Sequence, residues 1–289
     1  MATTRENHSA IVLTVDYCSA DAPKIFTQSM QQIGFAVLCN HPISMDLIHE
    51  AYQYWNDFFF SDKTTKECYL HQKNTQDGYF PFRTENAKDR KISDLKEFYH
   101  VYPWGRIPPN LRNISLKIYT ALEKLSAELL QWIENVLPTP IANQLSMPLK
   151  EMIKDSPNTL LRILHYPPLK DNEEEGAIRA APHEDINLIT LLPAATAPGL
   201  EVLDSTGQWH AVSCDPGSIV VNVGDMLQMC TGHYYKSTTH RVINPDNGDK
   251  RKSRFSMPLF LHPRPDVFLS KSCRADEYLH QRLREIGIY

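Results

Sequence analysis

The sequence predicts a mixed α/β fold that is mainly β, with a jelly-roll core flanked by helices. After residue 158, short apolar runs alternate with turns rich in Gly, Pro, Asn and Asp, which is typical of a β-sandwich or barrel. Before that point, two long segments carry apolar residues three or four positions apart, which indicates amphipathic helices. No linker rich in Gly, Ser or Pro separates the two parts, so we expect them to pack together.

Composition excludes several classes of protein. Apolar residues make up 42% of the 289 positions, enough for a sizeable core, which excludes a disordered chain. The formal net charge of -4 predicts no strongly basic face, so we expect no nucleic-acid partner. Residues 1–8 lack the apolar segment of a secretory signal, and no apolar run is long enough to cross a bilayer. Six scattered cysteines are typical of free thiols in a reducing compartment, so we expect a soluble cytoplasmic protein.

The first 60 residues alternate strand and helix. Residues 11–16 are β-branched and alternate in polarity, which predicts a short strand. A helix is expected over residues 22–34, ending at Gly34, and a strand over residues 35–39. Apolar residues at helical spacing predict a second helix over residues 44–60.

The middle of the chain is less regular. Residues 61–109 are polar and aromatic, with a turn at residues 78–82 and a strand over residues 94–101. The longest helix is expected over residues 111–137, where apolar residues recur on one face and predict a structural role for it. Seven later runs are predicted strands: residues 159–165, 186–192, 200–203, 209–212, 219–223, 240–243 and 255–260. A polar helix is expected over residues 266–289.

Three residues form a candidate metal site. His183 and Asp185 are two positions apart, so in an extended strand both side chains face the same way, while Glu184 faces away. His240 lies much further along the chain, where a β-fold can return it to the same place. Two histidines and one carboxylate on one face of an octahedron are diagnostic of non-haem Fe(II) oxygenases, because they leave positions open for a co-substrate and O2.

A candidate carboxylate site follows the metal site. Arg254 and Ser256 are again two apart, and a guanidinium beside a hydroxyl matches a carboxylate group. Tyr166, before two prolines, offers a second hydroxyl. Together the three side chains could hold the distal carboxylate of a 2-oxoacid whose other end chelates the iron.

At this point the sequence resembles the Fe(II)- and 2-oxoglutarate-dependent dioxygenases of the isopenicillin N synthase-like family. The resemblance covers nearly the whole chain and rests on motifs in family order: Gly34-Phe35-Ala36-Val37, Gly78-Tyr79, His183-x-Asp185, Asn222-Val223-Gly224-Asp225, His240-Arg241-Val242 and Arg254-x-Ser256. It implies a double-stranded β-helix core with helices outside, iron on His183, Asp185 and His240, and 2-oxoglutarate on Arg254, Ser256 and Tyr166. It also implies a single oxygenase unit over residues 1–289, with an N-terminal dioxygenase region at 1–110 and the binding core at 158–265.

The implied activity couples decarboxylation of 2-oxoglutarate, to succinate and CO2, with hydroxylation of a small organic substrate; desaturation or ring closure would need only a different fate of the substrate radical. Fe(II), 2-oxoglutarate and O2 are the expected cofactors and co-substrates, with ascorbate as an additional candidate. We expect a small-molecule substrate, no membrane partner, and a monomer or weak homo-oligomer. Candidate substrate-binding residues are Arg162, Phe80, Phe82 and Phe98, with a plain core role as the alternative for the three aromatics.

Two alternatives stay open at the level of sequence. Isopenicillin N synthase and aminocyclopropanecarboxylate oxidase also carry Arg-x-Ser but do not use 2-oxoglutarate, so an oxidase of the same fold, drawing its electrons from the substrate or from ascorbate, is one. A non-catalytic β-sandwich that binds a small ligand is the other. Leu164 also stands where many plant members have an amide that contacts the co-substrate, which places that one contact in question.

Overall fold

The structure is a computed structural model that describes residues 11–72, 75–85, 92–245 and 249–285. Its helices are α1 Ala22–Ile33, α2 Met45–Phe59, α3 Lys63–Glu67, α4 Pro109–Asn135, α5 Thr139–Ala142, α6 Leu149–Ile153, α7 Asp225–Cys230 and α8 Ala275–Glu285. Its strands are β1 Leu13–Asp16, β2 Phe35–Cys39, β3 Gly78–Phe80, β4 Glu97–Val101, β5 Leu160–Tyr166, β6 Ala180–His183, β7 Ile189–Pro193, β8 Leu200–Leu203, β9 Trp209–Ala211, β10 Ile219–Val223, β11 His240–Val242, β12 Arg254–Ser256, β13 Leu259–Leu261, β14 Phe268–Ser270 and β15 Cys273–Arg274.

Two sheets form the centre of the molecule. The larger has nine strands in the order β1-β2-β10-β7-β13-β5-β4-β3, with β12 also paired to β5, and the smaller has the order β6-β11-β8-β9. An apolar cluster draws side chains from both sheets, such as Val220 and Phe98 from the larger and Val202 from the smaller. This arrangement is the double-stranded β-helix, so the predicted mainly β jelly-roll core with flanking helices is confirmed.

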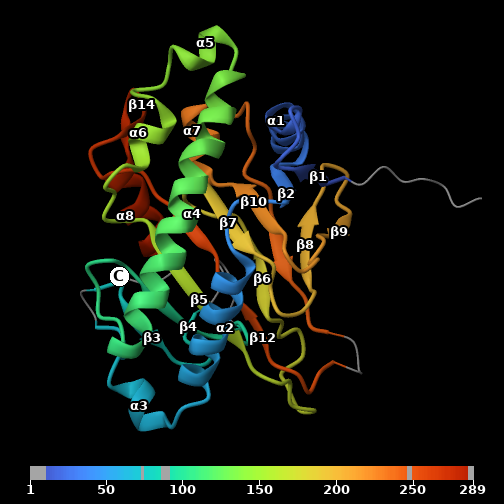
Figure 1. Cartoon of the computed structure of the whole chain (residues 1–289), viewed down its shortest axis with the longest axis vertical. Coiled ribbons are helices and arrows are strands. Elements are labelled where there is room, and N and C mark those ends of the chain that lie inside the picture. Colours follow the sequence, from blue (N-terminus) through green and yellow to red (C-terminus); the bar gives the residue numbers. More distant parts are fainter. Residues whose placement is uncertain (1–10, 73–74, 86–91, 246–248, 286–289) are drawn as a thin grey trace, which may run out of the picture.

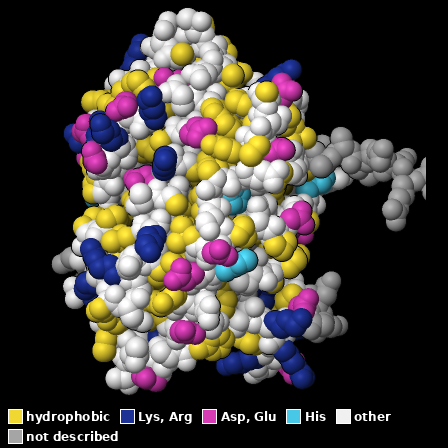
Figure 2. Space-filling model, viewed as in Figure 1, with side chains coloured by type: hydrophobic (Ala, Val, Ile, Leu, Met, Phe, Trp, Pro, Cys, Tyr) yellow, Lys and Arg dark blue, Asp and Glu magenta, His cyan; other side chains and the backbone are white. Residues whose placement is uncertain are grey.

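Helices cover the outer face of the larger sheet. Figure 1 shows α4 running across this face with α2 beside it. Trp55 of α2, Leu125 of α4 and Leu191 of β7 belong to one buried apolar cluster, which is the main core. The apolar stripe of α4 therefore has the structural role predicted for it. On the molecular face drawn in Figure 2, acidic and basic side chains are interspersed.

The N-terminal strands belong to the larger sheet. β2 pairs antiparallel with β10, with Val37 opposite Val220, and β1 pairs parallel with β2. The expected strands and helices of the first 60 residues are all present, with bounds that differ by one or two residues. The N-terminal segment and the jelly roll consequently share one sheet and one set of backbone hydrogen bonds.

Several elements differ from the predictions. The expected turn at residues 78–82 begins with β3, whose three residues pair with β4 and are all buried. The expected strand at residues 255–260 is two strands, β12 and β13, interrupted at Met257 and Pro258, because proline has no N–H to donate to a ladder. The expected C-terminal helix begins only at Ala275, after the β14–β15 hairpin, and residues 286–289 lie outside the described part of the chain. The predicted elements lack helices α3, α5, α6 and α7 and strands β6, β14 and β15, although His183 and Asp185 were expected in an extended strand.

Gly34 joins helix α1 to strand β2 under two constraints. Its φ of 74° is left-handed, and its N–H donates to the carbonyl of Met30 to close the helix. A Cβ atom at this position would lie 2.4 Å from the carbonyl oxygen of Lys236, in the segment that leads to β11. Only glycine satisfies both constraints.

Replacing Gly34 with alanine should therefore destabilise the fold more than a left-handed backbone alone explains. Gly207 is a matched control, because its φ is 85° but nothing lies within 4 Å of a Cβ placed there. We expect Gly34→Ala to lower the free energy of unfolding by about 1 to 3 kcal/mol more than Gly207→Ala, measured by urea denaturation. Equal losses for the two variants would show that the contact with Lys236 relaxes without cost.

His262, just beyond β13, gives a pH-dependent contribution to stability. It is buried, and burial lowers its pKa to about 4. As the pH falls below about 6.5, this histidine binds a proton in the unfolded chain but stays neutral in the folded chain. The free energy of unfolding is therefore undiminished above that pH and falls as the pH drops toward 4. We expect His262→Gln to reduce this loss by up to about 3 kcal/mol, measured as the difference in urea stability between pH 7.5 and pH 4.5. An unchanged pH dependence would mean that His262 is protonated in the folded state.

Candidate metal centre and co-substrate site

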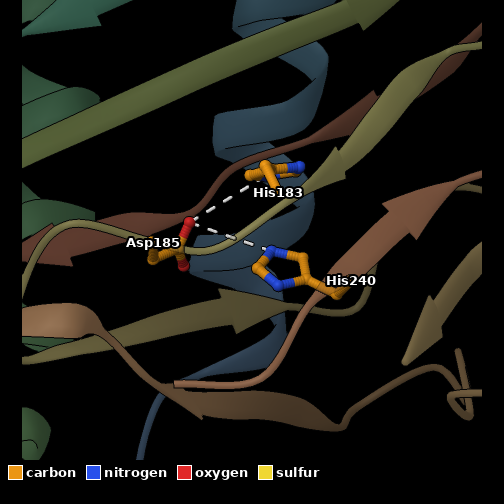
Figure 3. Close-up of side chains that lie close together, drawn as sticks. All are labelled: His183, Asp185 and His240. Atoms are coloured by element: carbon orange, nitrogen blue, oxygen red, sulfur yellow. Dashed lines mark ion pairs between the residues drawn. The ribbon is translucent and has the colours of Figure 1, made fainter. Parts of the chain in front are cut away.

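The pairing of β6 with β11 brings two histidines together. His183 ends β6 and His240 begins β11, and the two residues lie opposite each other in the antiparallel register. Asp185 follows two residues after His183. Its Oδ1 lies 4.0 Å from Nε2 of His183 and 3.8 Å from Nε2 of His240 (Figure 3). One nitrogen or oxygen from each of the three residues lies within 4.8 Å of the others, which fits three ligands around one metal ion.

Hydrogen bonds set the direction of both imidazole rings. Nδ1 of His183 donates to the carbonyl of Ala181, 2.7 Å away, and Nδ1 of His240 donates to the carbonyl of Thr238, 3.1 Å away. With Nδ1 carrying the proton, each Nε2 keeps its lone pair and faces Asp185. The side chain of His183 is 39% exposed, whereas those of His240 and Asp185 are 9% and 5% exposed, so the site is open on the His183 side.

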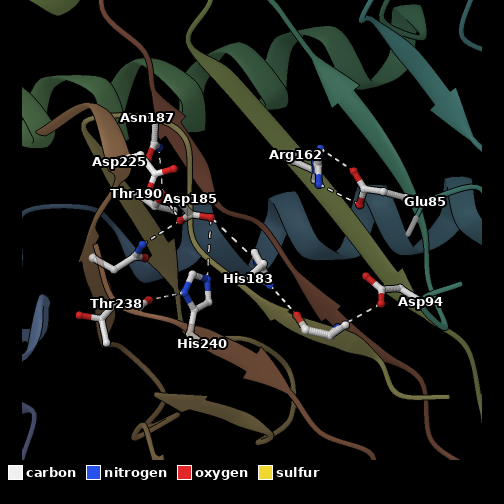
Figure 4. Close-up of polar contacts among 12 residues, drawn as sticks. Glu85, Asp94, Arg162, His183, Asp185, Asn187, Thr190, Asp225, Thr238 and His240 are labelled. Atoms are coloured by element: carbon white, nitrogen blue, oxygen red, sulfur yellow. Dashed lines mark hydrogen bonds and ion pairs between the residues drawn. The ribbon is translucent and has the colours of Figure 1, made fainter. Parts of the chain in front are cut away.

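The two oxygens of Asp185 have different surroundings. Oδ2 accepts hydrogen bonds from Oγ1 of Thr190, at 2.5 Å, and from Nδ2 of Asn222, at 2.7 Å (Figure 4). Oδ1 is left to face the histidines. Burial acts to raise the pKa of Asp185, but His240, His183 and these two donors outweigh it and hold the pKa below its usual value. The carboxylate is therefore charged and ready to bind a cation.

The turn that carries Asp185 is held by the start of α7. The N–H of Asp225 donates to the carbonyl of Asp185, at 2.7 Å, and the N–H of Gly224 donates to the carbonyl of Leu188. A Cβ on Gly224 would lie 2.2 Å from the carbonyl oxygen of Asn187, so only glycine allows this approach. The Asn222-Val223-Gly224-Asp225 motif thus positions the third ligand. The sequence revealed the motif, but the role of Asn222 and that of Thr190 were missed.

Glu184 faces away from the three ligands, as predicted, because its carboxylate accepts a hydrogen bond from the hydroxyl of Thr239. The short β6 ends at His183, so Asp185 lies in the following turn and not in a continuous strand. The common direction of His183 and Asp185 therefore depends on the α7 contacts as well as on strand alternation.

The candidate carboxylate site lies where β12 meets the end of β5. Arg254 is opposite Tyr166 in the register, and Ser256 is opposite Leu164. The Arg254 guanidinium lies 5.1 Å from the centre of the Tyr166 ring, its Nε donates to the carbonyl of Ala197, and its Nη1 is buried without a hydrogen-bond partner. A buried guanidinium N–H without an acceptor fits a carboxylate ligand that completes the site.

The structure brings three of the four candidate substrate residues together. Phe80 of β3 and Phe98 of β4 are buried and stacked, with ring centres 4.6 Å apart, in the same apolar cluster as Tyr166. The guanidinium of Arg162 lies 4.7 Å from the centre of the Phe98 ring. Phe82 is not in this group: it follows β3 and is 38% exposed.

Arg162 belongs to a buried charged network that the sequence did not reveal. It pairs with Glu85 at 3.3 Å, and Lys96 lies 2.6 Å from Glu85 and 2.9 Å from Asp94. Burial acts to raise the pKa of Glu85, but Arg162 and Lys96 hold it far below its usual value. Among these residues, two carboxylates therefore balance two cations.

This network reaches the metal ligands. Oδ1 of Asp94 accepts a hydrogen bond from the N–H of Ala181, at 3.0 Å, and the carbonyl of Ala181 accepts the bond from His183 (Figure 4). A single peptide segment thus links the carboxylate of Asp94 to the ring of His183. These residues are far apart in the sequence, and no local pattern marks them. They meet through the pairing of β4 with β5 and through hydrogen bonds from Leu95 to Ile178 and from Ala181 to Asp94.

Comparison with known proteins supports this geometry. The family model of the 2OG-Fe(II) oxygenase superfamily matches residues 157–263, and the model of the non-haem dioxygenase in morphine synthesis N-terminal region matches residues 20–115. A crystal structure described as an oxygenase from Shewanella oneidensis is 50% identical, with a TM-score of 0.87, and the match covers 96% of this chain and 99% of that one.

Two further relatives agree. A crystal structure assigned to the 2OG-Fe(II) oxygenase family, from Caulobacter crescentus, is 31% identical with a TM-score of 0.80, and the match covers 96% of this chain and 100% of that one. Gibberellin 2-beta-dioxygenase 1 of Arabidopsis thaliana is 28% identical over 88% of this chain and 78% of its own length.

A double-stranded β-helix with a cluster of two histidines and one carboxylate defines the class of non-haem iron oxygenases. Within that class, the chain belongs to the 2OG-Fe(II) oxygenase superfamily, as its isopenicillin N synthase-like motifs predicted. It is an oxidoreductase that uses Fe(II) and 2-oxoglutarate and acts on a small molecule. Family membership favours this activity over the non-catalytic binding protein. In the described part of the chain, no helix is long and apolar enough to cross a membrane.

The amide of Asn222 gives a test of how Asp185 is positioned. Asn222→Ala removes one donor to Oδ2, so the carboxylate can turn and Fe(II) affinity should fall about 10- to 100-fold, measured by anaerobic competition with a chromogenic chelator. Asn143→Ala, at an exposed site after α5, is the control and should keep the affinity of the unaltered protein. Unchanged affinity in Asn222→Ala would mean that Thr190 alone fixes the carboxylate.

Proposed function

We propose that His183, Asp185 and His240 hold the Fe(II) ion of this oxygenase, within a binding core at residues 158–265. The observation that carries the proposal is the convergence of two Nε2 atoms on one carboxylate oxygen, with the other nitrogen of each ring and the other oxygen already bonded to the protein. Side chains arranged in this way present only their free lone pairs to the centre.

We propose that Arg254, Ser256 and Tyr166 hold the distal carboxylate of 2-oxoglutarate. The buried and unpartnered Nη1 of Arg254 supports this role, and so does the register that aligns Arg254 with Tyr166. A guanidinium on this carboxylate fixes the far end of the co-substrate, which sets the direction of its keto-acid end toward the metal ligands.

When bound, iron and 2-oxoglutarate supply the oxidising power, because decarboxylation to succinate and CO2 uses one oxygen atom of O2 and leaves the other for the substrate. The protein contributes position and shielding. Asn222 and Thr190 keep Asp185 directed at the site, Ala181 and Thr238 keep the histidines directed at it, and the apolar cluster excludes water from the surroundings.

We propose that Phe80, Phe98 and Arg162 form one wall of the substrate pocket and that Phe82 lies at its rim. The stacked pair supplies a flat apolar surface, and Arg162, although paired with Glu85, presents its planar face to Phe98. Hydroxylation is the default outcome.

The six free cysteines, some of them exposed, support a reducing compartment, the cytoplasm, as the site of action. We also propose that the protein is a monomer or a weak homo-oligomer.

The proposed ligands can be tested by separating iron binding from co-substrate binding. Asp185→Ala should abolish Fe(II) binding, because it removes the only charged ligand, whereas Arg254→Ala should keep Fe(II) and weaken 2-oxoglutarate by at least about tenfold. The measurements are chelator competition for iron and anaerobic calorimetry for 2-oxoglutarate. Asp171→Ala and Arg112→Ala, both at exposed positions, are matched controls.

Turnover is tested with a library of small organic substrates, read out as succinate formed per O2 consumed. The proposal predicts succinate only when 2-oxoglutarate is present, and none from Asp185→Ala. O2 consumption without succinate would instead support the oxidase, and unchanged 2-oxoglutarate affinity in Arg254→Ala would remove the proposed carboxylate site.

A further inference from the structure

Two buried arginines lie around the ring of Tyr166. One is Arg254 of β12, the proposed ligand of the distal carboxylate. Arg179, immediately before β6, is only 1% exposed, and its guanidinium lies 5.9 Å from the centre of the Tyr166 ring, compared with 5.1 Å for Arg254. Among the described residues, Arg179 and Arg254 are the two largest fully buried side chains after Trp55.

Within the described ranges, neither arginine has a carboxylate at ion-pair distance; Asp249, whose charge acts on Arg179 from further away, is exposed and paired with Lys252. Arg179 donates from Nη2 to the carbonyl of Lys252, 3.2 Å away, and its Nε is buried without a partner. Arg254 is similar: its Nε donates to the carbonyl of Ala197, and its Nη1 is buried without a hydrogen-bond partner. Arg162 differs, because it pairs with Glu85. A buried cation without a counter-ion is costly, so two of them side by side indicate a site that is completed by an anion.

The charges of the two arginines act on each other. Burial, and then the charge of Arg254, lower the pKa of Arg179 to about 10. Arg179 therefore stays charged at neutral pH, although the charge of Arg254 repels it. An anion placed near the Tyr166 hydroxyl would relieve this repulsion and accept hydrogen bonds from both sides.

We infer that Arg179 is a second arginine for the distal carboxylate of 2-oxoglutarate and binds it together with Arg254 around Tyr166. The inference rests on the proposed role of Arg254. Arg179 takes no part in the chemistry. It contributes to the affinity for 2-oxoglutarate only, through the carboxylate that lies far from the iron.

The position of Arg179 along its strand supports the distal end. Arg179 lies four positions before His183, so at about 3.3 Å per residue the two Cα atoms are at most about 13 Å apart. Its contact with the Lys252 carbonyl places the guanidinium beside the start of β12, two residues before Arg254. Arg179 is thus on the Arg254 side of the site and away from the metal ligands.

The test compares two 2-oxoacids of equal chain length. 2-Oxoglutarate has the distal carboxylate, whereas 2-oxovalerate lacks it. The Kd of 2-oxovalerate divided by the Kd of 2-oxoglutarate therefore measures recognition of that carboxylate alone. Both are titrated calorimetrically, without O2, into protein loaded with Mn(II) in place of Fe(II). Arg179→Met and Arg254→Met are compared with Arg112→Met, an exposed control, and thermal unfolding verifies that each variant is folded.

We expect Arg179→Met to lower the ratio by at least about tenfold through weaker 2-oxoglutarate binding, with the Kd of 2-oxovalerate unchanged. Arg179→Lys keeps the charge without the planar fork and should retain part of the ratio, which also covers the case in which the Met variant does not fold.

Three results would overturn the inference. Equal weakening of both 2-oxoacids would assign Arg179 a structural role only. A ratio that falls in Arg254→Met but not in Arg179→Met would leave the proposed function intact and remove Arg179 from the site. If the ratio changes in neither variant, the Arg254 assignment itself is wrong.

Discussion

The antiparallel register between β6 and β11 is the constraint on which the rest of the site depends. It sets His183 opposite His240, although they are 57 positions apart in the sequence. The remaining ligand comes from a turn, which needs support from a different part of the chain. Helix α7 gives that support through Gly224, while Asn222 of β10 restrains the carboxylate itself. One ligand set therefore uses both sheets.

Buried charge is divided between two regions of the interior. On the β4 side, Glu85 and Asp94 neutralise Arg162 and Lys96, so this region is electrically complete and can serve as a rigid wall. On the β12 side, Arg179 and Arg254 lie around the Tyr166 ring, and among the described residues neither has a carboxylate at ion-pair distance. The first arrangement holds protein segments in place, and the second is suited to a dianionic co-substrate.

The sequence was most informative where a local pattern determines geometry. Alternation related Arg254 to Ser256, and the helical period located α4 and its buried face. The β6 strand escaped prediction because Ala180-Ala181-Pro182-His183 has neither β-branched residues nor alternation, and only its pairing with β11 makes it a strand. Arg179 and the network around Glu85 escaped for a related reason. Their partners are distant in the sequence, and burial of a charge cannot be inferred from a single position.

The strand order has a consequence for how the protein is made. β13 lies between β5 and β7, and each of these strands is synthesised well before it. Until residues 259–261 leave the ribosome, β5 and β7 each have an unpaired edge toward the missing strand. The N-terminal β2 likewise has an unpaired edge until β10 is synthesised. The nascent chain consequently exposes sheet edges for most of its synthesis, a state in which chaperones protect proteins from aggregation. Iron can enter a finished site only after translation has passed the last strand of the barrel.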